Sequence, residues 1–228
     1  MTDLCPEQLT GLSETHLVLT ECGVKMHPQA AAAFARMQQA AKQDGLTLKI
    51  ISGFRSFERQ AKIWYSKLAG ERPVYDLQGK LIDMNQLDVG EKLHAVLLYS
   101  ALPGASRHHW GTDVDIYDAQ AVPQNYQVQL QEAEYSAGGP FYPARQWLSL
   151  HAGRFGFFFP YQEYQGGVAA EPWHISYQPI SSRCEQLLSC EVLKQCIVQH
   201  PIAQQNAVLN ALPVLYSRYV RNICRSSA

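Results

Sequence analysis

SRHHWGTDVDIYD, residues 106 to 118, is the most informative segment of the chain, because it ends in a clear β-strand pattern and carries histidines and aspartates. From residue 112 to 117, polar and apolar side chains alternate. Alternate residues of a strand point to opposite faces of the sheet. Asp113 and Asp115 are therefore predicted on one face, with Val114 and Ile116 behind them against an apolar core.

A second segment, EPWH at residues 171 to 174, can complete a metal site with this strand. Catalytic zinc usually takes three protein ligands from His, Asp, Glu or Cys and keeps a fourth position for water. His108, Asp115 and His174 are the predicted ligands. Glu171 is then left as a general base, provided that Pro172 gives the chain an irregular entry into the strand.

The composition of the chain does not by itself indicate a function, so the prediction rests on such local groups of residues. The chain has 228 residues, 46% of them hydrophobic, with 19 Lys and Arg against 20 Asp and Glu. This is enough to bury a full core, and a net charge of -1 does not favour nucleic acid or an anionic membrane as the main partner. No transmembrane segment is expected.

The N-terminus lacks the basic and apolar regions of a signal peptide, so a cytoplasmic location is predicted. Six cysteines lie at positions 5, 22, 184, 190, 196 and 224, none of them in a C-x-x-C pair. Reduced thiols are the simplest interpretation. A periplasmic or exported protein with disulfides is the alternative if a leader precedes this sequence.

Hydrophobic periodicity and helix caps predict the order of elements. Helices are expected at 28–44, from the Ser56 cap to about 70, at 89–99 and at 144–152, with strands at 46–50, 112–117 and 171–177. After residue 180 glycine nearly disappears and the pattern becomes helical, interrupted at Pro201 and Pro213. The predicted domains are therefore a zinc-binding domain at 1–180 and a C-terminal helical extension at 181–228.

Several other residues are candidates for the site, each with a plainer interpretation. Arg55 lies at a strand-to-helix junction, where a guanidinium can hold a carboxylate, although a surface ion pair is commoner. Ser106 and Gln60 can contact a substrate, or form a turn and an exposed surface. His109 should point away from its neighbour, and Asp113 competes with Asp115 as the ligand.

Three segments together resemble a known family. SGFRSFERQ at 52–60, SRHHWGTDVDI at 106–116 and EPWHISY at 171–177 resemble, in order and spacing, the signatures of zinc D-alanyl-D-alanine carboxypeptidases of the vancomycin-resistance (VanY-like) type. These belong to the superfamily that includes lysostaphin and the hedgehog fold. The resemblance covers about residues 25 to 180 and leaves the helical extension outside it. Three ordered motifs are far more specific than one His-to-Asp spacing.

The resemblance implies an α+β fold, with a small central antiparallel sheet that carries one zinc ion per chain and helices packed on one side. It implies that His108, Asp115 and His174 bind zinc and that Glu171 is the catalytic base and acid. Arg55 would polarise the scissile carbonyl or bind the substrate carboxylate. The implied substrate contacts are Arg55, Gln60, Ser106 and Trp173.

The implied activity is that of a metallocarboxypeptidase that hydrolyses the C-terminal D-amino acid of peptidoglycan stem peptides, their precursors or turnover fragments. An L,D-carboxypeptidase or an endopeptidase on the same peptides is the alternative, and a non-catalytic zinc-scaffold binding protein is a third hypothesis. Two features depart from the family. Asp113 replaces a small residue, and no signal peptide accompanies a substrate found mostly outside the cytoplasm.

Overall fold

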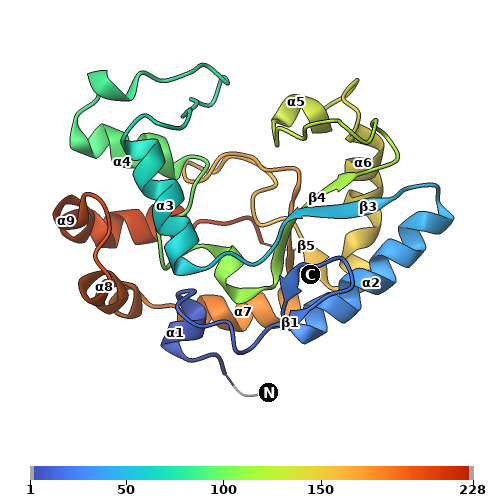
Figure 1. Cartoon of the computed structure of the whole chain (residues 1–228), viewed down its shortest axis with the longest axis horizontal. Helices are drawn as coiled ribbons and strands as arrows, with labels where there is room; N and C mark the ends of the chain where they lie inside the picture. Colours follow the sequence, from blue (N-terminus) through green and yellow to red (C-terminus); the bar gives the residue numbers. More distant parts are fainter. Residues whose placement is uncertain (1–2, 226–228) are drawn as a thin grey trace.

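A four-stranded antiparallel sheet lies at the centre of the computed structural model, which describes residues 3–225 (Figure 1). Its strands are β3 (Leu48–Ser52), β4 (Asp113–Asp118), β6 (His174–Tyr177) and β5 (Phe157–Phe158), in that spatial order. A separate hairpin joins β1 (Val18–Leu19) to β2 (Lys25–Met26). The α+β prediction is confirmed, with β4 as a central strand.

One face of the sheet is covered by two helices, α2 (Pro28–Gln43) and α6 (Tyr142–His151). Val114 and Ile116 of β4 and Ile175 of β6 are fully buried in the core that these helices share with the sheet. Because side chains alternate along a strand, the odd-numbered aspartates of β4 must lie on the other face. The apolar packing thus fixes the direction of the candidate ligands.

The remaining long helices form a second core beside the sheet. They are α3 (Phe57–Leu68), α4 (Val89–Leu97), α7 (Gln178–Leu187), α8 (Cys190–Gln199) and α9 (Gln205–Leu215). Trp64 of α3 is fully buried there, and its indole N–H donates to the carbonyl of Ala203 at 3.0 Å. The helical extension thus packs on α3 and α4, as Figure 1 shows at the left. A domain boundary at residue 180 stays a prediction, and α7 crosses that position.

Short helical elements connect these parts. They are α1 (Pro6–Leu9), η1 (Met84–Gln86), η2 (Arg107–Trp110), α5 (Glu132–Tyr135) and η3 (Ala152–Phe155).

Pro201 follows the end of α8 as predicted, but Pro213 lies inside α9 and does not interrupt it. An interior proline removes one backbone hydrogen bond and its ring crowds the carbonyl four residues earlier. Here α9 continues to Leu215, and a π-helical turn, Tyr216–Val220, follows it.

No helix within residues 3–225 is both long and apolar enough to cross a membrane. All six cysteines are free in the structure, and Cys184, Cys196 and Cys224 are buried. The cellular compartment stays a prediction.

Candidate metal centre

A tight turn delivers His108 to the sheet. The short 3-10 helix η2 ends at Gly111, whose φ of 68° is in the left-handed region. A Cβ at Gly111 would lie 2.3 Å from the side chain of Leu17 and 2.8 Å from the backbone nitrogen of His27. Glycine is therefore required here both for its conformation and for its lack of a side chain. The turn places His108 above the start of β4.

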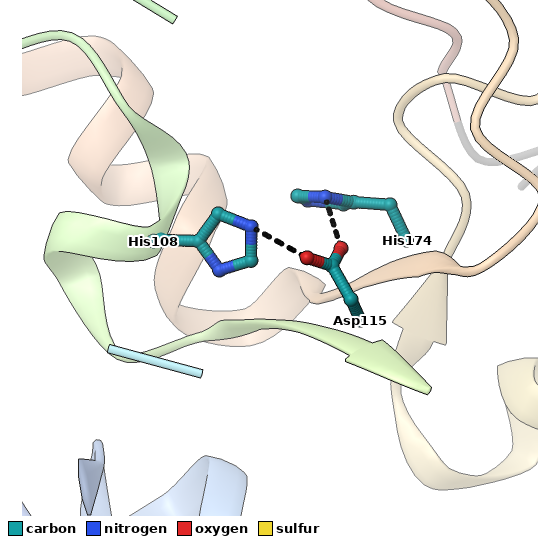
Figure 2. Close-up of side chains that lie close together, drawn as sticks. All are labelled: His108, Asp115 and His174. Atoms are coloured by element: carbon teal, nitrogen blue, oxygen red, sulfur yellow. Dashed lines mark ion pairs between the residues drawn. The ribbon is translucent and has the colours of Figure 1, made fainter. Parts of the chain in front are cut away.

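Strand register then brings His174 beside Asp115, because these two residues are paired across β4 and β6. Nδ1 of His174 lies 3.1 Å from Oδ1 of Asp115, and Nε2 of His108 lies 3.4 Å from Oδ2 of the same carboxylate. Figure 2 shows the two imidazoles on either side of this carboxylate. One ligand atom from each of the three residues lies within 4.8 Å of the others.

The donor set fits a zinc ion. All three side chains are buried, and Oδ1 of Asp115 and Nδ1 of His108 have no hydrogen-bond partner among the described residues. Buried polar atoms normally have a partner, so a bound cation would account for the unpaired carboxylate oxygen. Burial opposes the charge on Asp115, but His108 and His174 outweigh it and hold the pKa of Asp115 well below its usual range. An ionised carboxylate with two imidazoles is a common zinc ligand set.

Asp113 has a different position from the one expected of a competing ligand. It is fully buried, and its Oδ1 lies 3.0 Å from Nε2 of His174, on the far side of that ring from Asp115. Thr112 and Ser176 donate hydroxyl hydrogen bonds to Oδ2 of Asp113 at 2.6 and 3.0 Å. Asp113 thus orients the ring of His174 from behind. Second carboxylates of this kind commonly fix the tautomer of a metal-binding histidine.

Arg107 supplies the charge that keeps Asp113 buried. Its Nε donates to Oδ1 of Asp113 at 2.7 Å, and its two terminal nitrogens donate to Glu185 at 2.6 Å and to Ser176 at 2.7 Å. Arg225 in turn donates to the other oxygen of Glu185 at 2.8 Å. A chain of hydrogen bonds therefore runs from His174 to the helical extension.

Glu171 lies beside the cluster because the chain turns before β6 begins. The backbone N–H of His174 donates to the carbonyl of Glu171 at 3.0 Å, and Oε2 of Glu171 lies 3.4 Å from Nδ1 of His174. Burial raises the pKa of Glu171 to about 7, against the opposing charges of His174, Arg55 and Lys67. A carboxyl group with a pKa near neutrality can accept and return a proton. The irregular entry expected from Pro172 is present as a turn.

Arg55 is held by neighbours on three sides. Its guanidinium donates to Gln60 Oε1 at 2.8 Å and to the hydroxyl of Ser52 at 3.1 Å, and its carbonyl lies 2.6 Å from Nδ1 of His109. Gln60 is fully buried and uses its amide nitrogen on the carbonyl of Ala101. Gln60 thus lies behind Arg55, and its contact with a substrate stays a prediction that this burial does not favour. His109 points away from the cluster, although η2 is helical and not extended as expected.

A cavity of about 640 Å³ opens over the cluster. Its walls include all three candidate ligands together with Arg55, Ser106, Glu171 and Trp173. Trp173 lies in the turn before β6 and packs on Tyr135 and Phe141, in a cluster separate from the core that contains Ile175. Of the predicted site residues, all except Gln60 line this cavity.

Residues 23–180 match the protein-family model described as VanY: D-alanyl-D-alanine carboxypeptidase. The chain belongs to this family. The match covers the three signature segments and ends within the first turn of α7. The structural setting of the motifs therefore agrees with the resemblance seen in the sequence.

The chain is similar to other proteins in sequence and, for solved structures, in fold. An uncharacterized protein of Haemophilus influenzae is 36% identical over 121 residues, which cover 52% of this chain and 92% of that protein. The structure of VanYB in complex with D-alanine-D-alanine has a TM-score of 0.53 at 21% identity, covering 85% of this chain and 87% of the other. A mutant vancomycin-resistance D,D-pentapeptidase VanY in complex with Zn(II) has a TM-score of 0.52 at 22% identity, with 78% and 87% covered.

Some polar residues around this VanY-type site were not anticipated from the sequence. Arg107 lies inside the second signature segment, but its partner Glu185 is 78 positions away and could not be assigned from the sequence. Lys67 and Ser100 also line the cavity, with a hydrogen bond of 2.7 Å between them. The only sequence signal for Lys67 is its place one helical turn beyond Trp64, which is buried.

Proposed function

We propose that this protein is a zinc-dependent D-alanyl-D-alanine carboxypeptidase that removes the C-terminal D-amino acid from peptidoglycan stem peptides. One observation carries the proposal. The two histidines and the aspartate lie in one cavity with a partly buried glutamate, whose Oε2 is 3.4 Å from Nδ1 of His174. Three ligands and a base are the minimum set for metal-assisted peptide hydrolysis. Membership of the VanY family supports the choice of substrate.

His108, Asp115 and His174 would hold the zinc ion. When bound, zinc supplies a Lewis acid that polarises a carbonyl and increases the acidity of water. Glu171 accepts the proton of the attacking water at its carboxylate and returns it to the nitrogen of the leaving D-amino acid. The raised pKa of Glu171, about 7, suits both transfers near neutral pH.

Arg55 supplies positive charge at the reacting end of the peptide. It has no carboxylate partner within 4.0 Å among residues 3–225, so its charge is available to the terminal carboxylate or to the scissile carbonyl. Its hydrogen bonds to Gln60 and Ser52 fix the guanidinium in one position. A fixed cation of this kind needs little reorganisation when the substrate binds. The hydroxyl of Ser106 also lines the cavity and is free to contact the peptide.

Metal analysis combined with a panel of defined stem peptides tests the proposal. We expect about one zinc ion per chain. We also expect the terminal D-alanine to be released from peptides that end in D-alanyl-D-alanine, and mass spectrometry detects the products. Release from tetrapeptides alone would assign an L,D-carboxypeptidase, and internal cleavage an endopeptidase. Zinc without hydrolysis of any peptide would favour the binding-protein hypothesis.

A further inference from the structure

A partly buried lysine in the same cavity has no role in the proposed reaction. Lys67 lies near the end of α3 and lines the cavity together with Arg55 and Arg72. Its Nζ donates one hydrogen bond, at 2.7 Å, to the hydroxyl of Ser100, which is 8% exposed. An ammonium group carries three donors. Two of them have no protein partner among the described residues.

The charge of Lys67 is also uncompensated. None of Arg55, Lys67 and Arg72 has a carboxylate within 4.0 Å in the described part of the chain. Burial lowers the pKa of Lys67 to about 8, and the like charges of Arg55 and Arg72 act in the same direction, against Glu171. Partly buried charges are normally paired, since burial without a partner is costly. Arg55 and Lys67 are partly buried without such a partner, and the exposed Arg72 lines the same cavity, so an anionic ligand there would compensate their charge.

The number of cations exceeds what a single terminal carboxylate needs. In the proposed function Arg55 serves the reacting end of the peptide, next to the candidate ligands. Lys67 and Arg72 remain, and the volume of about 640 Å³ has room for more than one amino-acid residue. The cavity therefore has room for a longer peptide, with Lys67 and Arg72 lining the same space.

We propose that Lys67, with the hydroxyl of Ser100 and with Arg72, forms an anion subsite that binds a second carboxylate of the peptide, separate from its C-terminal one. This inference rests on the proposed function and specifies its substrate class. The preferred substrate is a peptide with an acidic group on a residue upstream of the cleaved bond. Lysine binds a carboxylate as a point charge, and the serine hydroxyl holds the ammonium in place.

Two matched stem peptides test the subsite, one with the upstream carboxylate free and one with it amidated. The wild-type enzyme should cleave the free acid with a kcat/KM about tenfold higher, the magnitude of one charge-assisted hydrogen bond. Lys67→Met should abolish this preference by lowering kcat/KM for the free acid only. Lys62→Met, which removes an exposed lysine of the same helix, should keep the preference.

The outcomes separate the two proposals. If the wild-type enzyme cleaves both peptides equally well, the subsite is overturned and the proposed function stands. The subsite is likewise overturned if Lys67→Met, shown by its thermal unfolding transition to be folded, loses the same factor in kcat/KM on both peptides. If neither peptide is cleaved by the zinc-loaded wild-type protein, both the function and the subsite that rests on it are overturned. The wild-type comparison does not depend on the folding of any variant.

Discussion

Oδ1 of Asp113 lies 3.0 Å from Nε2 of His174, while Nδ1 of the same ring faces Asp115. The imidazole is thus held between two carboxylates, and only one of them belongs to the candidate ligand set. Burial disfavours a charged His174, but the hydrogen bond to Asp113 and the negative charges of Asp113 and Asp115 raise the pKa of His174 to about 10. The ring is oriented before any metal arrives.

Asp113→Asn should weaken zinc binding, because an amide is a poorer partner for the N–H of His174 than a carboxylate. Loss of such an outer partner typically costs about 10- to 100-fold in metal affinity. Competition with a chromophoric chelator measures this without any assay of activity. Asp118→Asn is the matched control, since it changes another buried carboxylate of β4, whose Oδ1 accepts, within residues 3–225, only from the backbone N–H groups of Thr47 and Gln120. Equal zinc affinities in the two variants would contradict the orienting role.

Glu171→Gln should keep zinc and lose hydrolysis. The amide preserves the size of the side chain but cannot accept the proton of water, so we expect kcat to fall about 10²- to 10⁴-fold. Metal content and stem-peptide hydrolysis are measured on the same sample. Glu163→Gln, in an exposed loop, is the control and should retain activity. Near-normal turnover by the Glu171 variant would remove this residue from the mechanism.

Removing the metal should destabilise the protein. A ligand that binds only the folded state stabilises it by about 2.7 kcal/mol at a concentration of 100 Kd. For a chain of this length, this corresponds to a Tm higher by roughly 5 to 10 °C. Thermal unfolding with a chelator, and then with added zinc, follows the change. His108→Ala should abolish the response to zinc, and a variant that still responds fully would place the metal elsewhere.

Gly111→Ala should destabilise the fold more than a comparable change elsewhere. The left-handed backbone costs a residue with Cβ about 1 to 2 kcal/mol, and contact with Leu17 and His27 adds an overpacking cost of about 1 to 3 kcal/mol. Gly79→Ala isolates the first effect, because its φ is +74° and no atom lies within 4 Å of the added Cβ. Urea unfolding compares the two variants, and equal losses would contradict the predicted clash.

The preference for a second carboxylate should depend on pH. Lys67 has a lowered pKa of about 8, so its ammonium is present below pH 8 and is lost as the pH rises through that value. The ratio of kcat/KM for the free and amidated peptides should therefore fall above pH 8. This ratio cancels the titration of groups that act on both peptides alike. In Lys67→Arg, the guanidinium stays protonated, and the preference should persist to pH 10.

Local sequence patterns were sufficient to predict that the candidate ligands lie close together. Strand alternation gave the direction of Asp115, and a glycine turn allowed His108 to approach it. These are properties of a few neighbouring residues, and sequence periodicity reports them directly. The α+β fold follows for the same reason, since the apolar faces of β4 and β6 need helices to cover them.

Contacts between distant segments were beyond what the sequence could show. Asp113 was considered a competing ligand because it shares a strand face with Asp115, and only the position of His174 reveals that it binds from behind. Gln60 was predicted to contact a substrate, with an exposed surface position as the alternative, yet the packing of α3 buries it beneath Arg55. The pairing of Arg107 with Glu185 depends on where α7 docks, which no local pattern encodes.

The hydrogen-bond chain from His174 through Asp113 and Arg107 to Glu185 ends in the helical extension, beyond the residues that match the family model. Replacing Glu185 alone would leave Arg107 buried with only one of its two carboxylate partners. Such a variant is expected to retain metal less well, although Glu185 lies outside the candidate ligand set. The extension therefore acts as a remote counterion for the site, and its mutations are expected to have the phenotype of active-site lesions.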